Sequence, residues 1–238
     1  MMLFQGKMQG WGTRGRMLAC LLMLVCGVPA PAQERHPVTG REIAGVMGFG
    51  GAPWLERSER EREEAPEKAL DAIGITPGMK IADIGAGTGY FSRRMAKRAE
   101  PGGKVFAVDI QPRMLDALRR NAERERITNI ETVLGREDDP LLPARSLDLV
   151  LMVDVYHELA RPQGMLRRLR EALKPDGRMV LLEYRREDPE VPIKIDHKMT
   201  IQQAKAEVEA EGFTLREVIS ALPRQHILIF VPGARRVQ

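Results

Sequence analysis

The sequence predicts an α/β fold in which helices cover both faces of a mostly parallel sheet. Three observations support this. From about residue 79 onward, short apolar runs alternate with helical patterns, a glycine-rich loop follows the first run, and the last two runs have no helix between them. Alternation of this kind is typical of parallel sheets, and two consecutive strands without a crossover helix should be antiparallel.

The predicted strands are apolar runs, most of them bounded by glycine or proline. The run at 147–153 (LDLVLMV) is nearly all apolar, as expected of a strand buried on both faces. By the same pattern we place strands at residues 79–84, 104–108, 130–134, 147–153, 179–184, 214–219 and 226–231.

The predicted helices fill the gaps between these runs. Pro112 stands at the expected start of one, where its fixed φ suits a helix and no backbone N–H is needed. The segment 53–64 alternates in charge, so we expect it to form an exposed helix, and 41–47 a short helical stretch. The other predicted helices span residues 67–73, 90–99, 164–173 and 201–210.

The first 32 residues differ from the rest of the chain. They carry basic but no acidic residues, followed by an apolar run at 17–28 and then by Ala30-Pro31-Ala32. This is the pattern of a secretory signal peptide, and the apolar run is shorter than the roughly 20 residues of a membrane span. We therefore predict export to the periplasm with cleavage after Ala32. The alternatives are an uncleaved anchor, or a misassigned start codon before a cytoplasmic protein.

Cleavage would change the chemistry of the chain. Cys20 and Cys26 are its two cysteines, so the mature chain would contain no disulfide and no thiolate ligand. Three basic residues would also be lost, which brings the mature chain close to neutrality. We therefore expect no nucleic-acid partner and no stable membrane span in the mature chain. The predicted division is a signal peptide at 1–32, a connector with cap helices at 33–65 and the main domain at 66–238.

The segment 83–89 (DIGAGTG) follows the first predicted strand. Gly85, Gly87 and Gly89 would let the backbone turn sharply and approach a ligand without side chains in the way. The helix that follows would point its free N–H groups at the same place. A ligand site is therefore expected at this turn.

Asp109 ends the second predicted strand, where an acid can accept hydrogen bonds from both hydroxyls of a ribose. Ile110 could pack against an adenine ring. Dinucleotide-binding loops use the spacing G-x-G-x-x-G, which would place the third glycine at position 90. Here Tyr90 occupies that position and Gly89 is the third glycine, so the spacing departs from the dinucleotide pattern.

Four segments together resemble the class I methyltransferases that use S-adenosylmethionine (SAM). Their first motif resembles residues 83–90, and their second strand with its ribose-binding acid resembles residues 105–109. Their fourth strand resembles residues 148–153, and the turn before their fifth strand resembles residues 173–178 (LKPDGR). In that turn Asp176 replaces a glycine. The resemblance covers roughly residues 66 to 232. It is strongest to the ubiquinone/menaquinone biosynthesis type and extends to exported bacterial members with no assigned substrate.

The resemblance implies a Rossmann-like sheet of seven strands in the order 3-2-1-4-5-7-6, with strand 7 antiparallel. It also implies SAM as the cofactor, bound by Asp83, the three loop glycines, Asp109 and Ile110. An acid or amide after the third strand should contact the adenine amino group. The candidates in this sequence are Glu137, Asp138 and Asp139, of which we favour Asp138, with Glu137 second.

Methyl transfer from SAM needs alignment of the acceptor, and a general base only if the acceptor must lose a proton. In the family, the segment after the fourth strand faces the transferred methyl group. His157 is therefore the candidate base or orienting group, although it could instead satisfy the backbone of its loop. Asp154 could hold the amino group of SAM or fix the loop. Trp54 and Leu55 could close over the cofactor or simply pack the cap.

His157, Glu158 and His197 are the residue types that bind metals, but their spacing gives little support for a site, and we predict no metal. We interpret the basic residues between 185 and 198 as a solvated face rather than a site for an anionic acceptor. The leading function is methyl transfer from SAM to a small-molecule acceptor, which could be lipophilic. The alternatives are a SAM-binding protein without methyl transfer and a nicotinamide-dependent oxidoreductase.

Overall fold

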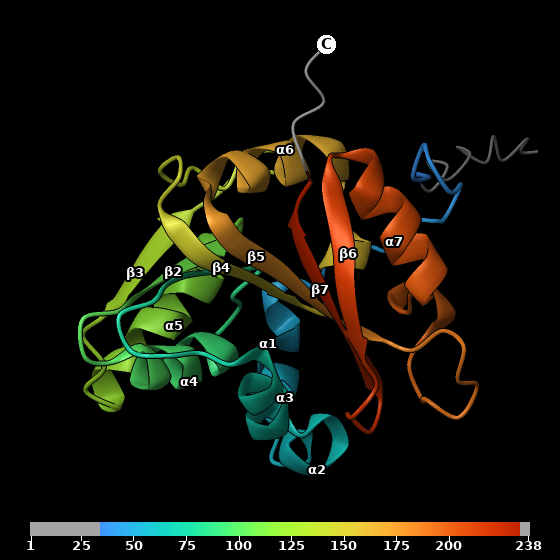
Figure 1. Cartoon of the computed structure of the whole chain (residues 1–238). Helices are drawn as coiled ribbons and strands as arrows, with labels where there is room; N and C mark the ends of the chain where they lie inside the picture. Colours follow the sequence, from blue (N-terminus) through green and yellow to red (C-terminus); the bar gives the residue numbers. More distant parts are fainter. Residues whose placement is uncertain (1–33, 234–238) are drawn as a thin grey trace, which may run out of the picture. The chain divides into compact units, whose positions relative to one another are not determined.

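The computed structural model of the protein describes residues 34–233, so the predicted signal peptide lies outside the described residues. Its centre is a seven-stranded sheet with the order β3-β2-β1-β4-β5-β7-β6 (Figure 1). The strands are β1 (Lys80–Ile84), β2 (Lys104–Asp109), β3 (Ile130–Leu134), β4 (Leu147–Val153), β5 (Leu173–Tyr184), β6 (Phe213–Ile219) and β7 (Gln225–Pro232).

The pairing of the strands confirms the predicted fold. β3, β2, β1, β4 and β5 pair in parallel, whereas β7 pairs antiparallel with both β5 and β6. β5 begins at Leu173, before the predicted start at 179, because Leu173 already pairs with Leu147 of β4. The next paired residues are Leu149 and Arg178, so the residues between Leu173 and Arg178 form an irregularity within this pairing.

Helices cover both faces of the sheet, as the alternating pattern predicted (Figure 1). The α-helices are α1 (Ala52–Leu55), α2 (Arg60–Glu64), α3 (Pro66–Ile73), α4 (Tyr90–Ala99), α5 (Pro112–Arg124), α6 (Pro162–Ala172) and α7 (Ile201–Ala210). Three short 3-10 helices are η1 (Phe49–Gly51), η2 (Tyr156–Glu158) and η3 (Ile195–His197).

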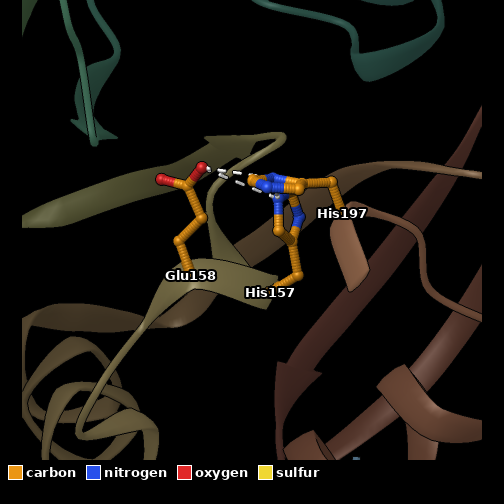
Figure 2. A group of neighbouring side chains, drawn as sticks. All are labelled: His157, Glu158 and His197. Atoms are coloured by element: carbon orange, nitrogen blue, oxygen red, sulfur yellow. Dashed lines mark hydrogen bonds and ion pairs between the residues drawn. The ribbon is translucent and has the colours of Figure 1, made fainter. Parts of the chain in front are cut away.

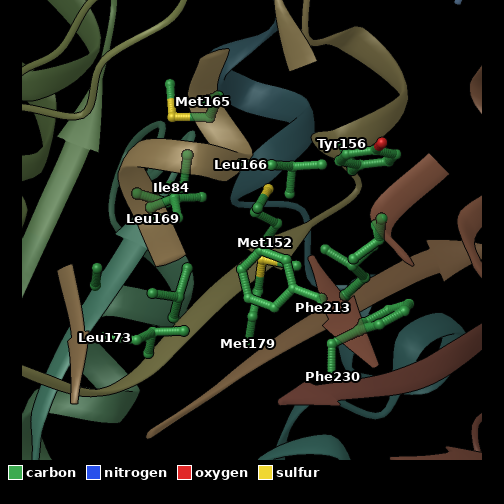
Figure 3. Packing of buried hydrophobic residues seen from close by; sticks show 14 of the residues in the cluster. Ile84, Met152, Tyr156, Met165, Leu166, Leu169, Leu173, Met179, Phe213 and Phe230 are labelled. Atoms are coloured by element: carbon green, nitrogen blue, oxygen red, sulfur yellow. The ribbon is translucent and has the colours of Figure 1, made fainter. Parts of the chain in front are cut away.

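Alternate residues of each strand face opposite layers. In β4, Val150 and Met152 pack in the layer with α6 and α7, whereas Leu149 and Leu151 pack in the layer with α3 and α4. Figure 3 shows the first of these layers, where Met152 lies among apolar side chains of α6 and of the other strands. The parallel strands are thus buried on both faces, and their carboxyl ends are the open edge on which a ligand site can form.

The N-terminal segment differs from its predicted structure. Residues 41–47 form no helix; an isolated bridge between Arg35 and Glu42 closes a turn there instead. The segment 53–64 is not one exposed helix but contributes to two short ones, α1 and α2, and Arg60 and Glu64 are buried. Charge alternation could not reveal this burial, because it depends on partners far along the chain. Within residues 34–233, no helix is long and apolar enough to cross a membrane.

Candidate functional site

A cavity of about 520 Å³ opens at the carboxyl ends of β1, β2, β4 and β5. Its wall combines the glycine loop, the ends of these strands and the N-terminal segment. The residues that line it include Val46, Trp54, Leu55, Arg57, Arg60, Glu64, Gly85, Gly87, Asp109, Ile110, Arg136, Glu137, Asp154, Val155, His157, Glu158, Tyr184, Lys194 and His197.

Two loop glycines line the cavity and one does not. Gly85 has φ +69°, and a Cβ there would lie 2.5 Å from Val155 Cγ2. Gly87 has φ +54°, and a Cβ would lie 2.7 Å from Leu55 Cδ1. Gly89 is outside the lining, and its close neighbour is Leu118 of α5. The first two glycines therefore shape the cavity, while the third allows α4 to pack on α5.

Asp109 lies at the cavity wall with both carboxylate oxygens engaged by the backbone. Oδ2 accepts the N–H of Gly87 at 2.9 Å, and Oδ1 accepts the N–H of Gln111 at 2.8 Å. Burial raises the pKa of Asp109, although these backbone hydrogen bonds oppose the shift. A carboxylate has further lone pairs for two hydroxyl donors. Next to it, Ile110 lines the cavity with 40% of its surface exposed, so an apolar ring could pack there.

Asp83 was predicted to contact the cofactor, but the structure places it behind the loop and outside the cavity lining. Its Oδ2 accepts a hydrogen bond from the Ser92 hydroxyl at 2.5 Å. Burial raises the pKa of Asp83 to about 7. The side chain thus ties the end of β1 to the first turn of α4 and positions the loop indirectly.

The acids after β3 fall in different places. Glu137, the second choice for the adenine contact, lines the cavity, whereas the favoured Asp138 does not. Asp138 lies instead against Gly164 of α6. Asp139 caps its own loop by accepting the N–H of Leu141 at 2.9 Å. Of the two acids, the structure thus places Glu137 in the cavity lining and turns Asp138 toward α6.

Asp154 follows β4 in the left-handed region, at φ +53°. Its Oδ2 accepts a hydrogen bond from Gln225 Nε2 at 2.8 Å, whereas the buried Oδ1 has no hydrogen-bond partner among the described residues. Burial, reinforced by the charges of Glu64 and Glu183, raises the pKa of Asp154 well above its ordinary value. A cation bound at the cavity would oppose this shift, so the Asp154 carboxyl group suits a bound ammonium group, such as the amino group of SAM.

The N-terminal segment is built into the cavity wall through Glu64. This carboxylate accepts hydrogen bonds from Arg60 Nε at 2.6 Å, Arg57 Nη2 at 2.7 Å and the Tyr184 hydroxyl at 2.8 Å. Arg60 and Glu64 are site residues that the sequence pattern does not indicate. No local signal marks them, because the Tyr184 partner at the end of β5 is 120 positions away.

The proposed lid residues lie at the same wall. Trp54 and Leu55 both line the cavity, and Trp54 keeps 46% of its surface exposed. The Arg57 guanidinium lies 3.6 Å from the centroid of the Trp54 ring, a cation–π contact that orients the indole.

The basic residues after β5 separate into two groups. Lys194 lines the cavity. Arg185 and Arg186 instead donate to backbone carbonyls, Arg185 to Leu222 O at 2.8 Å and Arg186 to Ile195 O at 3.3 Å. These two arginines thus stabilise the backbone of the segments that contain Leu222 and Ile195.

His157 is almost fully buried and is held by Glu183. Its Nδ1 lies 2.6 Å from Glu183 Oε2, and the other oxygen of Glu183 accepts the N–H of Tyr156 at 2.9 Å. Burial lowers the pKa of His157, but the charge and hydrogen bond of Glu183 outweigh it, so the pKa is raised. Glu183 was missed in the sequence. The signal was present, since an acid inside the apolar run of a central strand needs a partner.

The other ring nitrogen of His157 faces two side chains at the cavity. Nε2 lies 3.1 Å from His197 Nδ1 and 3.9 Å from Glu158 Oε1 (Figure 2). Burial raises the pKa of Glu158 to about 7. Burial, together with the charge of His157, lowers the pKa of His197. The structure thus gathers three residues whose spacing in the sequence gave little reason to group them.

Comparison with known proteins agrees with the fold. A family model described as a methyltransferase domain matches residues 75–224. A SAM-dependent methyltransferase from Aquifex aeolicus has the same fold, with a TM-score of 0.74 and 22% identity over 78% of this chain and 98% of that one.

Curated relatives match a shorter stretch. Demethylmenaquinone methyltransferase of Tropheryma whipplei (strain Twist) is 37% identical over 116 residues, which are 49% of this chain and 46% of the relative. Protein-L-isoaspartate O-methyltransferase of Methanothrix thermoacetophila is 31% identical over 111 residues, or 47% and 50%. The chain spans about half the length of these relatives. The matching family model covers most of the sheet and its glycine loop, and the chain belongs to the class I SAM-dependent methyltransferase family.

Proposed function

We propose that the protein transfers a methyl group from SAM to a small acceptor whose body is apolar. One observation carries this proposal. A single cavity is lined both by the donor features, Gly87, Asp109 and Ile110, and by side chains after β4 and β5, such as Asp154 and His157. Its volume of about 520 Å³ lies within the range of small-molecule sites.

The cavity suits SAM in three respects. Asp109 offers lone pairs for ribose hydroxyls beside Gly87, whose lack of a side chain leaves room. Ile110 offers an apolar surface for adenine. The carboxyl group of Asp154 offers a counter-charge for the amino group. Glu137 completes this assignment as the acid for the adenine amino group, because it lines the same cavity.

The acceptor class follows from the exposed apolar side chains of the cavity wall. Val46, Trp54 and Ile110 line it with 47%, 46% and 40% of their surfaces exposed. Such a wall favours an acceptor with an apolar body. The name of the Tropheryma whipplei relative points the same way, since a demethylated menaquinone is a lipophilic molecule. In this proposal His157 and Asp154 stay the predicted catalytic residues, with His157 orienting the reacting group of the acceptor.

The experiment is a calorimetric titration of the full chain with SAM, beside Asp109→Ala and the control Asp116→Ala. Asp116 is an exposed acid of α5 that pairs with Arg119. We expect saturable binding of SAM, a loss of at least about tenfold in affinity in Asp109→Ala, and no change in the control. Unchanged affinity in Asp109→Ala would remove the ribose assignment.

Two further titrations address the alternative functions. Binding of NADH or NADPH without binding of SAM would replace the proposal by a nicotinamide-dependent oxidoreductase. Binding of SAM without methyl transfer to any of a panel of lipophilic quinols, phenols and amines would favour a SAM-binding protein. Release of S-adenosylhomocysteine together with a methylated product would support the proposal.

We further propose that the protein is exported to the periplasm. The support is the composition of residues 1–32, which combine a basic start, an apolar run and small residues at a cleavage site.

A further inference from the structure

Three potential metal ligands converge at one end of the cavity. Nε2 of His157, Nδ1 of His197 and Oε1 of Glu158 are separated by 3.1, 3.5 and 3.9 Å (Figure 2). A point equidistant from these atoms lies about 2 Å from each of them, close to the ordinary zinc–nitrogen and zinc–oxygen distances of about 2.0–2.2 Å. The spacing is therefore that of a coordination sphere.

The surroundings of His157 are those of a metal-binding histidine. Its Nδ1 is engaged by the buried carboxylate of Glu183 at 2.6 Å, which leaves Nε2 to face the cluster. A carboxylate on the far nitrogen fixes the tautomer and the ring orientation, and raises the basicity of the metal-facing nitrogen. Glu183 is itself fixed by the N–H of Tyr156.

Glu158 is also oriented with one oxygen toward the histidines. Its Oε2 accepts a long hydrogen bond from the N–H of Met47 at 3.4 Å, while Oε1 faces His157 and His197. η2 carries His157 and Glu158, and η3 carries His197, so two short helices after β4 and β5 bring the ligands together.

The carboxylates at this end of the cavity depend on histidines alone for their counter-charge among the described residues. Glu158 and Glu183 are both largely buried, and neither forms an ion pair with a lysine or arginine within residues 34–233. The two histidines are their only ion-pair partners in this part of the chain. Buried carboxylates without a balancing cation are costly, and a divalent ion would remove that cost.

We propose that His157, Glu158 and His197 bind one divalent transition-metal ion, with zinc as the expected metal. Two histidines and one carboxylate leave a coordination position open, as in zinc sites that act on a substrate. All three residues line the cavity, so that position is available to a molecule bound there. Binding of the metal alone does not depend on the function proposed above.

The role of the ion does rest on that proposed function. An acceptor oxygen in the open position would be held at the end of the cavity formed after β4 and β5, and the metal would lower the pKa of a hydroxyl bound to it. His157, with Nδ1 on Glu183 and Nε2 on the metal, would then act as a ligand rather than as a free base. The proposed acceptor is thereby narrowed to a molecule that has an apolar body and an oxygen atom able to bind the metal.

The test uses cobalt(II) as a spectroscopic probe of the zinc site. The full chain without an affinity tag carries Cys20→Ser and Cys26→Ser, which remove its only two thiols. After treatment with a chelator, it is titrated with CoCl₂ while the visible d–d absorption is recorded. We expect saturation at one ion per chain, with the intense bands of four- or five-coordinate cobalt, and displacement by ZnCl₂.

Two ligand variants and one matched control complete the experiment. His197→Ala and Glu158→Gln alter partly accessible ligands, and we expect each to weaken cobalt binding by at least about tenfold. His226→Gln is the control, because His226 pairs with Glu187 at 3.0 Å outside the cavity lining. Melting in the presence of chelator checks that every variant is folded.

Absence of a saturable cobalt band, or binding by folded His197→Ala equal to that of the parent, would overturn the metal site. Calorimetry with SAM on the same metal-free chain tests the methyl-donor site independently. Failure of cobalt binding and failure of SAM binding are therefore distinguishable results.

Discussion

Arg41 and Glu207 form a bidentate ion pair in the interior of the protein. Arg41 Nη2 lies 2.9 Å from Glu207 Oε2 and Nε lies 3.1 Å from Oε1, with both side chains almost fully buried. Arg41 also donates from Nη1 to the carbonyl of His157 at 3.1 Å. One arginine of the N-terminal segment thus joins α7 to η2 at the cavity.

Arg41→Ala should destabilise the protein by about 3–5 kcal/mol, because it leaves the buried carboxylate of Glu207 without its main counter-charge. The matched control is Arg35→Ala, whose ion pair with Glu42 is largely exposed and should contribute no more than about 1 kcal/mol. Urea unfolding gives both free energies. Equal effects of the two substitutions would contradict the structural role of Arg41.

Gly89→Ala should be more harmful than Gly102→Ala, although both glycines have φ +84°. The backbone strain of alanine is the same at both sites, about 1–2 kcal/mol. At position 89 the new Cβ would also lie 2.6 Å from Leu118 Cγ, whereas at position 102 it would meet open space. We expect an additional loss of about 1–3 kcal/mol in unfolding free energy for Gly89→Ala. If the two variants lost the same unfolding free energy, α5 would have to move away from residue 89 at little cost, which would contradict this prediction.

Asp83 should make the protein less stable as the pH rises. Burial raises its pKa to about 7 in the folded state, and the Ser92 hydrogen bond and the charge of Arg60 only partly oppose this. The unfolded carboxyl has a pKa of about 3.9, so between pH 4 and 7 the folded chain holds a proton that the unfolded chain has released. The free energy of unfolding therefore falls across this window, by up to about 1.4 kcal/mol per pH unit, and levels off above it.

Asp83→Asn removes this titration while keeping an oxygen for Ser92. Between pH 4.5 and pH 7.5 the parent should lose unfolding free energy that Asp83→Asn does not lose. The variant should therefore become more stable relative to the parent as the pH rises. Urea unfolding at intervals of half a pH unit measures it, and most other titrating groups cancel in the difference. A pH-independent difference would show that Asp83 is not protonated in the folded protein near pH 6.

Trp54 should report ligand binding by its fluorescence. It lines the cavity while nearly half exposed, so a bound ligand should exclude water from the indole and move its emission to shorter wavelength. The chain has two tryptophans, and Trp11→Phe leaves Trp54 as the single emitter. Addition of SAM to this variant should give a saturable blue shift. No change in emission at saturating SAM would place Trp54 away from the bound molecule.

Export predicts a specific N-terminus. Protein recovered from the periplasm of the native cell should begin at Gln33, after removal of residues 1–32. N-terminal sequencing checks this, and a chain that retains Met1 or is found only in the cytoplasm would contradict it.

The sheet was predictable from the sequence because its strands are continuous apolar runs between glycines and prolines. The same pattern gave the limits of α4 and α7 as the structure has them. The glycine loop and Asp109 were predictable as well, since their spacing follows from local geometry. These features depend on neighbours within one strand–loop–helix unit.

The remaining parts depend on distant partners and could not be predicted. Arg60 and Glu64 belong to a run of alternating charges that usually remains in solvent. Their burial depends on distant partners, which are the Tyr184 hydroxyl for Glu64 and the rings of Tyr90 and Phe91 for Arg60. His157 and His197 are 40 positions apart, and their approach requires the loops after β4 and β5 to fold toward each other. The direction of the loop after β3, which brings Glu137 and not Asp138 to the cavity, could not be inferred from composition.

The cavity wall is assembled from separate stretches of the chain. The glycine loop, Asp109 and Ile110 lie within residues 85–110, whereas Trp54, Leu55, Arg60 and Glu64 lie within 54–64. The segment 54–64 could therefore be exchanged for one of another length or shape while the glycine loop stays constant. A change in this segment alone would then alter which molecules fit the cavity, without disturbing the strands that support the glycine loop.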